Sequence, residues 1–536
     1  MDKTLNAETA GGVSGADARG EIFGHPRGLS TLFFTEMWER FSYYGMRALL
    51  MLYMTAEIAK GGLGFDNKTA APIYALYASS VYFLPLIGGW LADRYIGARR
   101  ATLIGGIIIM LGHFTLAFPQ ITFFYAGLVL VAVGTGFLKS NISAMVGDLY
   151  TRDDPRRDAG FSIFYMGINI GAFLAPLIVG NLGEKVNWHY GFAAAGFGMA
   201  LGLVQYVIGA KNLKNAGLPP RQKLEQALND GGITETVENK GNDFSYVMLM
   251  LGIVVLAGVS IALFGAPLMP TILIASLVGV IMTGAKDGLT RAEWRQLAMI
   301  GVLFTASCFF WAGFEQAPTS LNLFARDLTD RSLPIWLNEI VSSSVVQSTF
   351  LHYISDLFFS NNELAASAFQ AINALFIILL APVFSWLWLR LGKRQPSDPA
   401  KFSAGLFLLG LGFVVAAYAA YLTSTGKVSP YWLILVYLFH TMGELCLSPV
   451  GLSSMTKLAP IKMVSLMLGV WFLSISLGNY IAGLIGGEFE PTPDVLVSLF
   501  GKVAAVIIGG AIVLAILTPF VNKLTARSTV SDEEIA

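Results

Sequence analysis

The chain has 536 residues, of which 55% are hydrophobic and only 13% are charged, and its formal net charge is zero. A soluble domain carries about a quarter charged residues, so this composition excludes an ordinary soluble protein and indicates one that crosses a membrane many times. The zero net charge argues against a nucleic-acid partner. The two cysteines, Cys308 and Cys446, lie in apolar segments and predict no disulfide framework.

The apolar segments follow a polar start. Residues 1–27 lack the apolar core of a signal peptide and are predicted to be a cytoplasmic tail. A helix needs about 20 apolar residues to cross the bilayer. By that measure the chain predicts fourteen membrane helices, with approximate limits 29–58, 70–93, 99–118, 121–149, 159–182, 190–210, 244–264, 267–285, 296–324, 363–391, 401–423, 429–456, 461–486 and 496–521.

The orientation follows from the basic residues, because cytoplasmic connections carry an excess of Lys and Arg. With the N-terminus inside, the inner connections include the basic stretches DRYIGARR, TRDDPRRD and RLGKRQPSDPAK. The outer connections hold fewer basic residues. We therefore predict a multi-pass protein of the cytoplasmic (inner) membrane with both termini in the cytoplasm.

The fourteen segments contain an internal repeat. The pair at 244–285 has no charge before Lys286, and without it the chain divides into six plus six. WLADRYIGARR and WLWLRLGKRQ end the second segment of each half, and GFLKSN and GELCLSP occupy the fourth. The alternative is a chance match between short apolar strings.

A duplicated six-helix unit favours the all-α major facilitator fold, with a substrate site between the halves. The predicted regions are an N-terminal six-helix bundle, a cytoplasmic linker, two inserted helices, a C-terminal six-helix bundle that contains an external loop, and a cytoplasmic tail. In that order they span 28–210, 211–243, 244–286, 287–522 (loop 325–362) and 523–536.

The first predicted helix carries charges in apolar sequence, FFTEMWERFSYYGMRALLMLY (33–53). At about 100° per residue, its polar residues fall within a stripe of about 140°. A charge at the bilayer centre costs at least about 2.5 kcal/mol, so we expect the stripe to line a cavity. Salt bridges that only hold helices together are the alternative. The stripe contains Glu36, Glu39, Arg40, Tyr43, Tyr44 and Arg47.

Further ionisable residues lie deep in apolar sequence: Lys139, Glu315 and Glu444. Together with the first helix they give three bases against four acids. A carboxylate in excess within a low-dielectric cleft can bind a proton, and such a group can couple proton movement to substrate movement. The amides of Asn169 and Asn373 either contact the ligand or form bonds between helices. Such a cavity suits a zwitterion with a variable apolar middle.

Several motifs of this chain resemble those of the proton-dependent oligopeptide transporters, a branch of the major facilitator superfamily. EMWERFSYYG (36–45) matches the first-helix ExxERFxYYG motif in full. The resemblance covers 28–522, and the inserted pair is typical of prokaryotic members. The other matching stretches are GGWLADRYIGARRA, FSIFYMGINIGAF, FWAGFEQAPTSLNLFA, FQAINALFI and GELCLSPVGLS.

The resemblance implies a role for each matching residue. Proton coupling would involve Glu36, Glu39, Arg40 and Glu315. Gating salt bridges would join Arg47 to Glu315 and Lys139 to Glu444. Substrate would be bound by Arg40 and Lys139 at its carboxylate, by Asn169, Asn373 and Glu315 at its amino group, and by other residues of the same cavity: Tyr43, Tyr44, Arg47, Tyr82, Trp311, Glu444 and Trp471.

Some positions depart from the family pattern. The fourth-helix KPN motif reads Lys139-Ser140-Asn141, and Phe314 stands where some members carry a second acid. Animal members have a second-helix histidine at the position of Ala75. Proton coupling is therefore expected to rest on carboxylates.

The predicted function is proton-coupled symport of di- and tripeptides by alternating access. The alternative is a member of the same family that carries another small solute, such as an amino acid, nitrate or a peptide-like drug. The sequence has no HExxH, no GxSxG with partners and no cysteine cluster, so we expect no enzyme activity. We also expect no cofactor and no metal, and a functional monomer whose partners are the substrate, protons and the lipid bilayer.

Overall fold

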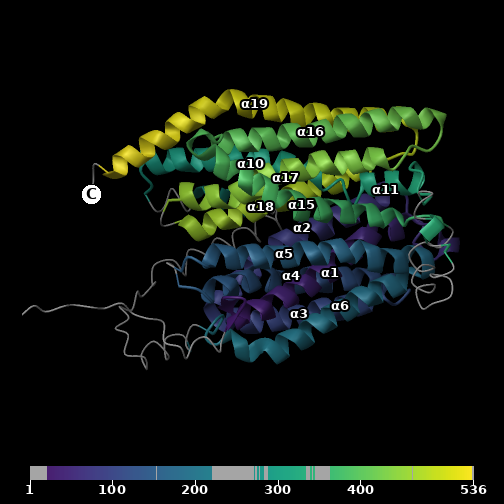
Figure 1. Ribbon diagram of the computed structural model, residues 1–536, viewed down its shortest axis with the longest axis horizontal. Helices are drawn as coiled ribbons and strands as arrows, with labels where there is room; N and C mark the ends of the chain where they lie inside the picture. Colours follow the sequence, from purple (N-terminus) through teal and green to yellow (C-terminus); the bar gives the residue numbers. More distant parts are fainter. Residues whose placement is uncertain are drawn as a thin grey trace, which may run out of the picture.

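The computed structural model describes residues 21–151, 154–219, 288–333, 362–460 and 463–533, with short pieces at 222, 271, 275–276, 278–279, 281–282, 338–340 and 342–343. Most of the predicted inserted helices (244–286), of the linker (211–243) and of the external loop (325–362) lies outside the described residues. The described helices form two bundles, which Figure 1 shows as a purple-to-blue layer and a teal-to-yellow layer.

The first bundle follows a short hairpin of β1 (Glu21–Ile22) and β2 (His25–Pro26). Its α2 is extended by the π-helical turn η3 (Ala92–Ile96), and α5 by the turns η4 (Pro176–Gly180) and η5 (Leu182–Val186). The short helix η6 (Ala210–Leu213) ends the bundle. The six long helices are α1 (Arg27–Thr55), α2 (Asn67–Leu91), α3 (Ala98–Leu116), α4 (Ile121–Asp148), α5 (Arg157–Ala175) and α6 (Trp188–Gly209).

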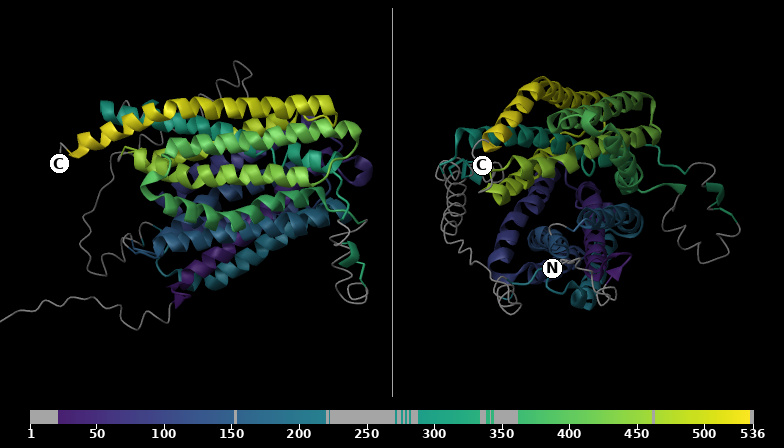
Figure 2. Two further views of the ribbon diagram at one scale, coloured as in Figure 1. Left: turned by 45° about the horizontal axis from the view of Figure 1, so that its top comes forward. Right: turned by 60° about the vertical axis from the view of Figure 1, so that its left-hand side comes forward.

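The second bundle is formed by the chain after residue 290. Figure 2 shows from two further directions that its last helix lies on the outer side of this bundle. The helices are α10 (Arg291–Phe314), continued after a break by α11 (Ser320–Asp327), then η8 (Ala366–Gln370), α15 (Ala371–Leu391), α16 (Asp398–Leu422), α17 (Tyr431–Leu458), α18 (Val464–Gly486) and α19 (Pro493–Glu533).

Ten helices of the described residues are long and apolar enough to cross a membrane. Two further helices, α1 and α3, complete the first bundle. The five charged residues of α1 and the two arginines at the start of α3, Arg99 and Arg100, lower the hydropathy of these helices. α1 nevertheless packs against α5 and α6, and α3 against α4 and α6. Each bundle therefore contains six membrane-length helices, as the repeat predicts.

The two bundles meet through equivalent helices. The second helix of the first half, α2, packs against α18, and the fifth, α5, packs against α15. Because α15 and α18 are the second and fifth membrane helices of the later half, these two contacts exchange under an approximate two-fold axis. This is the arrangement of parallel repeats.

Hydrogen bonds between the bundles gather at one end of the molecule, which we call the joined end. It contains the α1–α2 connection (56–66) and α11, at the right of Figure 1. The Asn322 side chain donates to the Ala48 carbonyl over 2.9 Å, and Asn67 donates to the Phe489 carbonyl over 2.7 Å.

Glu184 makes a further connection at the joined end. Its carboxylate accepts hydrogen bonds from the backbone N–H groups of Ala366 at 2.9 Å and Ser367 at 2.8 Å, and from the Ser367 hydroxyl. Glu184 belongs to η5 of the first bundle, and both partners belong to η8 of the second. One carboxylate of the first bundle therefore holds the start of η8 in the second bundle.

The predicted single helix at 296–324 is wrong. The chain leaves the helix at Phe314 and begins α11 at Ser320, because Pro318 lacks a backbone N–H and restricts the residue before it. Gln316 compensates for the break: its amide donates to the carbonyls of Ala312 and Ala482, each at 3.1 Å. Irregular backbone at membrane depth requires such partners.

Two helix ends also differ from the prediction. α11 continues to Asp327, into the predicted external loop, and α19 continues from the predicted limit at 521 to Glu533. Pro519 lies within α19. By contrast, α4 passes through Ser140 without interruption, in keeping with the absence of proline at that position.

Candidate functional site

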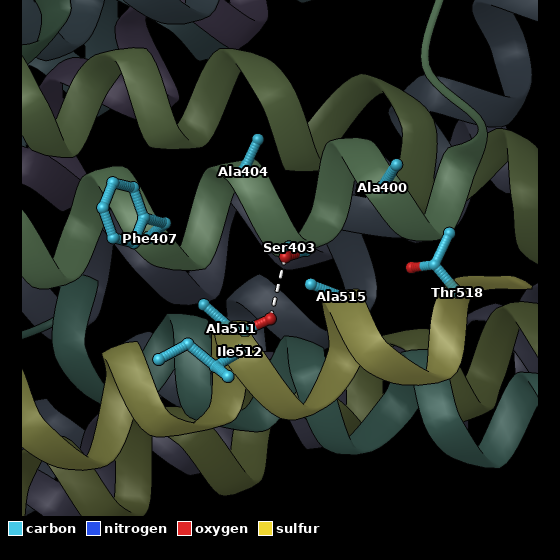
Figure 3. Close-up of a pocket in the computed structure, with 8 residues that line it drawn as sticks. All are labelled: Ala400, Ser403, Ala404, Phe407, Ala511, Ile512, Ala515 and Thr518. Carbon is cyan, nitrogen blue, oxygen red and sulfur yellow. Dashed lines mark hydrogen bonds between the residues drawn. The ribbon is translucent and has the colours of Figure 1, made fainter.

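Two of the hollows among the described residues differ in the chemistry of their walls. One, of about 350 Å³, is a groove between α16 and α19, and Figure 3 shows its mainly apolar side chains with the bond from the Ser403 hydroxyl to the Ala511 carbonyl (2.8 Å). No ionisable side chain lines it, so it offers nothing that recognises a charged ligand. The predicted polar residues are found in the other hollow.

The second hollow lies between the two bundles and has a volume of about 280 Å³. This is near the lower end of the range of about 300–1,000 Å³ for small-molecule pockets. Helices of both halves contribute charged, amide and aromatic side chains to its wall. The predicted site residues that line it are Arg40, Tyr44, Arg47, Tyr82, Lys139, Asn169, Trp311, Glu315, Asn373, Glu444 and Trp471.

The polar stripe of α1 is divided by the structure. Arg40, Tyr44 and Arg47 line the cavity, whereas Glu36, Glu39 and Tyr43 are buried behind them and do not. The prediction that the whole stripe forms a lining is wrong. A helix inside a bundle exposes only a narrow arc to a cavity, and its neighbours cover the rest of the stripe.

Other lining residues were absent from the predicted set. Tyr165 of α5 and Ser448 of α17 both face the cavity. A helical-spacing signal was available, because each lies four residues from a predicted residue, Asn169 and Glu444. Gln370, in η8, also lines the cavity, and it lies three residues from the predicted Asn373 within the predicted helix 363–391.

Arg40 is shared between two acids of its own helix. Its Nε lies 3.0 Å from a Glu36 carboxylate oxygen and is also in contact with the Glu39 carboxylate. All three side chains are buried. Two carboxylates thus compete for one guanidinium. Arg40 also lines the cavity, and its Nη2 forms no hydrogen bond with the described residues.

Arg47 forms an ion pair across the bundles. Its Nη1 lies 2.9 Å from a Glu315 carboxylate oxygen, and both side chains are buried. Glu315 directly follows the last residue of α10. It lies in the break between α10 and α11, and it lines the cavity. The pair that the family resemblance implies is present in this structure, and its role in gating stays a prediction.

Lys139 and Glu444 are not paired, which differs from the predicted bridge. The Lys139 ammonium lies 3.4 Å from the centroid of the Tyr82 ring, and Glu444 accepts a hydrogen bond from Asn373 at 3.1 Å. Neither forms an ion pair with another described residue. The bundles touch at the joined end, whereas Lys139 lies in the half of α4 nearer the other end, where the cavity separates it from Glu444.

The two amides of the cavity are held by acceptors. Asn169 donates from Nδ2 to the Tyr165 carbonyl at 3.0 Å, and Asn373 donates to the Thr441 hydroxyl at 3.0 Å and to Glu444. Both residues line the cavity. Because their nitrogen atoms face protein acceptors, each amide has its carbonyl oxygen left for a ligand.

Aromatic side chains complete the wall. Tyr82 and Trp471 come from the facing helices α2 and α18, and Trp311 comes from α10. The buried indole N–H of Trp311 has no hydrogen-bond partner among the described residues. The cavity therefore contains a cation, Lys139, and a carboxylate, Glu444, that form no ion pair with described residues, together with aromatic side chains. The Trp311 N–H is a further donor without a partner there.

The sequence pattern of the POT family matches residues 99–335 and 331–490 of this chain. The chain belongs to the POT family. POT members are transporters, so this chain is a membrane-spanning transporter with the major facilitator fold and not an enzyme, and the resemblance seen in its motifs is confirmed.

Other transporters are similar to this protein over nearly the whole chain. The "Uncharacterized transporter YclF" of Bacillus subtilis (strain 168) is 41% identical over 509 residues, 94% of this chain and 95% of the relative. A "Di-/tripeptide transporter" of Lactococcus lactis subsp. lactis (strain IL1403) is 37% identical over 516 residues, 94% and 97% of the two chains. The crystal structure of a peptide transporter POT in complex with sulfate superposes with a TM-score of 0.75 at 40% identity, covering 94% of this chain and 96% of that one.

Proposed function

We propose that this POT transporter imports di- and tripeptides by proton-coupled symport. The observation that carries the proposal is the placement of Lys139 and Glu444. They line one cavity from opposite bundles, and neither forms an ion pair with the other described residues. A free cation facing a free carboxylate matches the two charged ends of a short peptide. The similarity to transporters named for peptides supports the same substrate class.

The proposed coupling uses Arg40. With both Glu36 and Glu39 ionised, the Arg40 guanidinium is held by two carboxylates. A proton bound to either carboxylate weakens that hold, and Arg40 then joins Lys139 in binding the peptide carboxylate. An inward proton gradient favours the protonated, loaded carrier, and moving one charge across 100 mV supplies about 2.3 kcal/mol.

The proposed transport cycle is alternating access in a monomer. The Lys/Arg bias assigns the joined end to the outside and both termini to the cytoplasm of the inner membrane. Bundles joined at that end, with Lys139 and Glu444 apart, correspond to a carrier that faces the cytoplasm. Formation of a Lys139–Glu444 bridge would close the opposite side. The cavity and its charges come from one chain, so a second copy is not required.

The test is uptake of radiolabelled dialanine into proteoliposomes with an inward proton gradient and an inside-negative potential. We expect acid-stimulated uptake, and uptake that ignores the gradient would end the symport proposal. Glu36→Gln, Glu39→Gln and Glu315→Gln should lose driven uptake and retain exchange. A thermal-shift panel of dialanine, trialanine, alanine and nitrate tests the substrate class, since stabilisation by nitrate or alanine alone would replace peptides with another solute.

A further inference from the structure

A chain of hydrogen bonds fixes the amide of Asn373. The Thr441 hydroxyl donates to the Tyr437 carbonyl over 2.7 Å, and the same hydroxyl oxygen accepts from Asn373 Nδ2 over 3.0 Å. Asn373 Nδ2 also donates to Glu444 over 3.1 Å. Thr441 is fully buried and does not line the cavity, so it acts behind the wall.

The chemistry of the partners decides which end of the amide faces them. The Tyr437 backbone carbonyl only accepts hydrogen bonds, so the one proton of the Thr441 hydroxyl is used on it. The hydroxyl oxygen then offers only lone pairs to Asn373, and the Glu444 carboxylate likewise accepts. Two acceptors therefore hold the –NH₂ group, and the opposite orientation would bring the amide oxygen against both of them.

The consequence is found on the cavity side. Asn373 Oδ1 forms no hydrogen bond within the described part of the chain, and Asn373 lines the cavity. Its neighbours there include Glu444 and Glu315, which are also acceptors. A ligand end that donates several hydrogen bonds, such as an ammonium group, matches this set. A carboxylate does not.

We propose that Thr441 is a positioning residue that keeps Asn373 presented as an acceptor for the ammonium group of the ligand. The proposal rests on the proposed peptide function. Without the Thr441 hydroxyl, one amide N–H loses its partner, and Glu444 alone then holds the –NH₂ group, so the flipped orientation of the amide becomes less unfavourable. Rotation would turn the –NH₂ group toward the cavity, where it opposes an ammonium group.

The test compares ligands that differ only in the amino group. Thr441→Val removes the hydroxyl at nearly constant shape, and Thr441→Ser retains it. Dialanine and its des-amino analogue, propionyl-alanine, are measured as competitors on both variants and on the unaltered protein. We expect Thr441→Val to weaken dialanine about tenfold, propionyl-alanine to be unchanged, and Thr441→Ser to restore dialanine binding.

Each outcome separates the two proposals. Equal weakening of both ligands by Thr441→Val, or no weakening of dialanine, overturns the positioning role. If the unaltered protein binds no dialanine, the peptide proposal fails by itself, and alanine against propionate then makes the same ammonium comparison for Thr441. Thermal unfolding in detergent shows whether each variant is folded. If part of a sample is unfolded, the ratio of the dialanine and propionyl-alanine affinities is still unaffected, because both ligands bind the same folded fraction.

Discussion

The guanidinium of Arg47 lies 2.9 Å from the carboxylate of Glu315, and this buried pair joins the two bundles across the cavity. Arg47 lies within the continuous helix α1, whereas Glu315 directly follows the end of α10, at the break before α11. The pair therefore connects the interior of α1 to the end of α10.

Removal of one partner of the pair should be severe. Arg47→Ala leaves the Glu315 carboxylate buried without a counter-charge, and breaking a buried pair costs about 3–5 kcal/mol. Thermal unfolding in detergent measures the loss. The matched control is Lys60→Ala. Lys60 forms an ion pair with Glu57 at 3.0 Å, and both side chains are exposed to solvent, so this substitution should lower the free energy of unfolding by at most about 1 kcal/mol. Equal losses in the two variants would contradict the burial argument.

Neutralising the free cation should act on one end of the ligand. Lys139→Gln removes a charged donor worth about 1.5–3 kcal/mol, so dialanine affinity should fall roughly 10- to 100-fold. Dialanine amide, which lacks the carboxylate, should change little. Competition binding in detergent measures both. Lys60→Gln, at an exposed position, is the control, and a loss of the same size for the amide would remove Lys139 from carboxylate recognition.

Loss of the Glu184 contact should loosen the joined end. Glu184→Ala leaves the buried N–H groups of Ala366 and Ser367 unpaired, at about 1–3 kcal/mol for each buried group. Spin labels at the exposed positions Glu57 and Ser424, one on each bundle, should report a broader and longer distance distribution. Glu488→Gln, at an exposed position near the same end, is the control. An unchanged distribution in Glu184→Ala would show that the other contacts suffice.

The approach of α1 to α5 should depend on Gly171. A Cβ atom there would contact the Met37 carbonyl and lie 3.0 Å from the Phe41 nitrogen and 3.1 Å from Arg40 Cβ. Gly171→Ala should destabilise by about 1–3 kcal/mol through overpacking and displace Arg40. Gly301→Ala, with no atom within 4 Å of its Cβ, should be neutral or slightly stabilising. Thermal unfolding and dialanine binding measure both, and a neutral Gly171→Ala would contradict the close packing.

Composition and segment length determined the membrane class, and the repeat determined two bundles of six helices. Both can be predicted because the thickness and apolarity of the bilayer set the length and composition of every segment that crosses it. The motifs also named part of the cavity wall, because helical spacing places charges such as Arg40 and Arg47 on one side of α1. The sequence alone thus carried the fold class, the family and eleven of the lining residues.

Only the tertiary structure decided how those residues are used. Glu36, Glu39 and Tyr43 are buried behind the cavity wall because neighbouring helices cover that side of α1. Lys139 and Glu444 are unpaired among the described residues because the bundles touch at the joined end and are separated by the cavity at these two residues. The tertiary structure also connected Thr441 to Asn373 across two helices. The physical reason is that helix periodicity fixes a side chain's direction on its own helix, whereas its partners depend on long-range packing that no local pattern records.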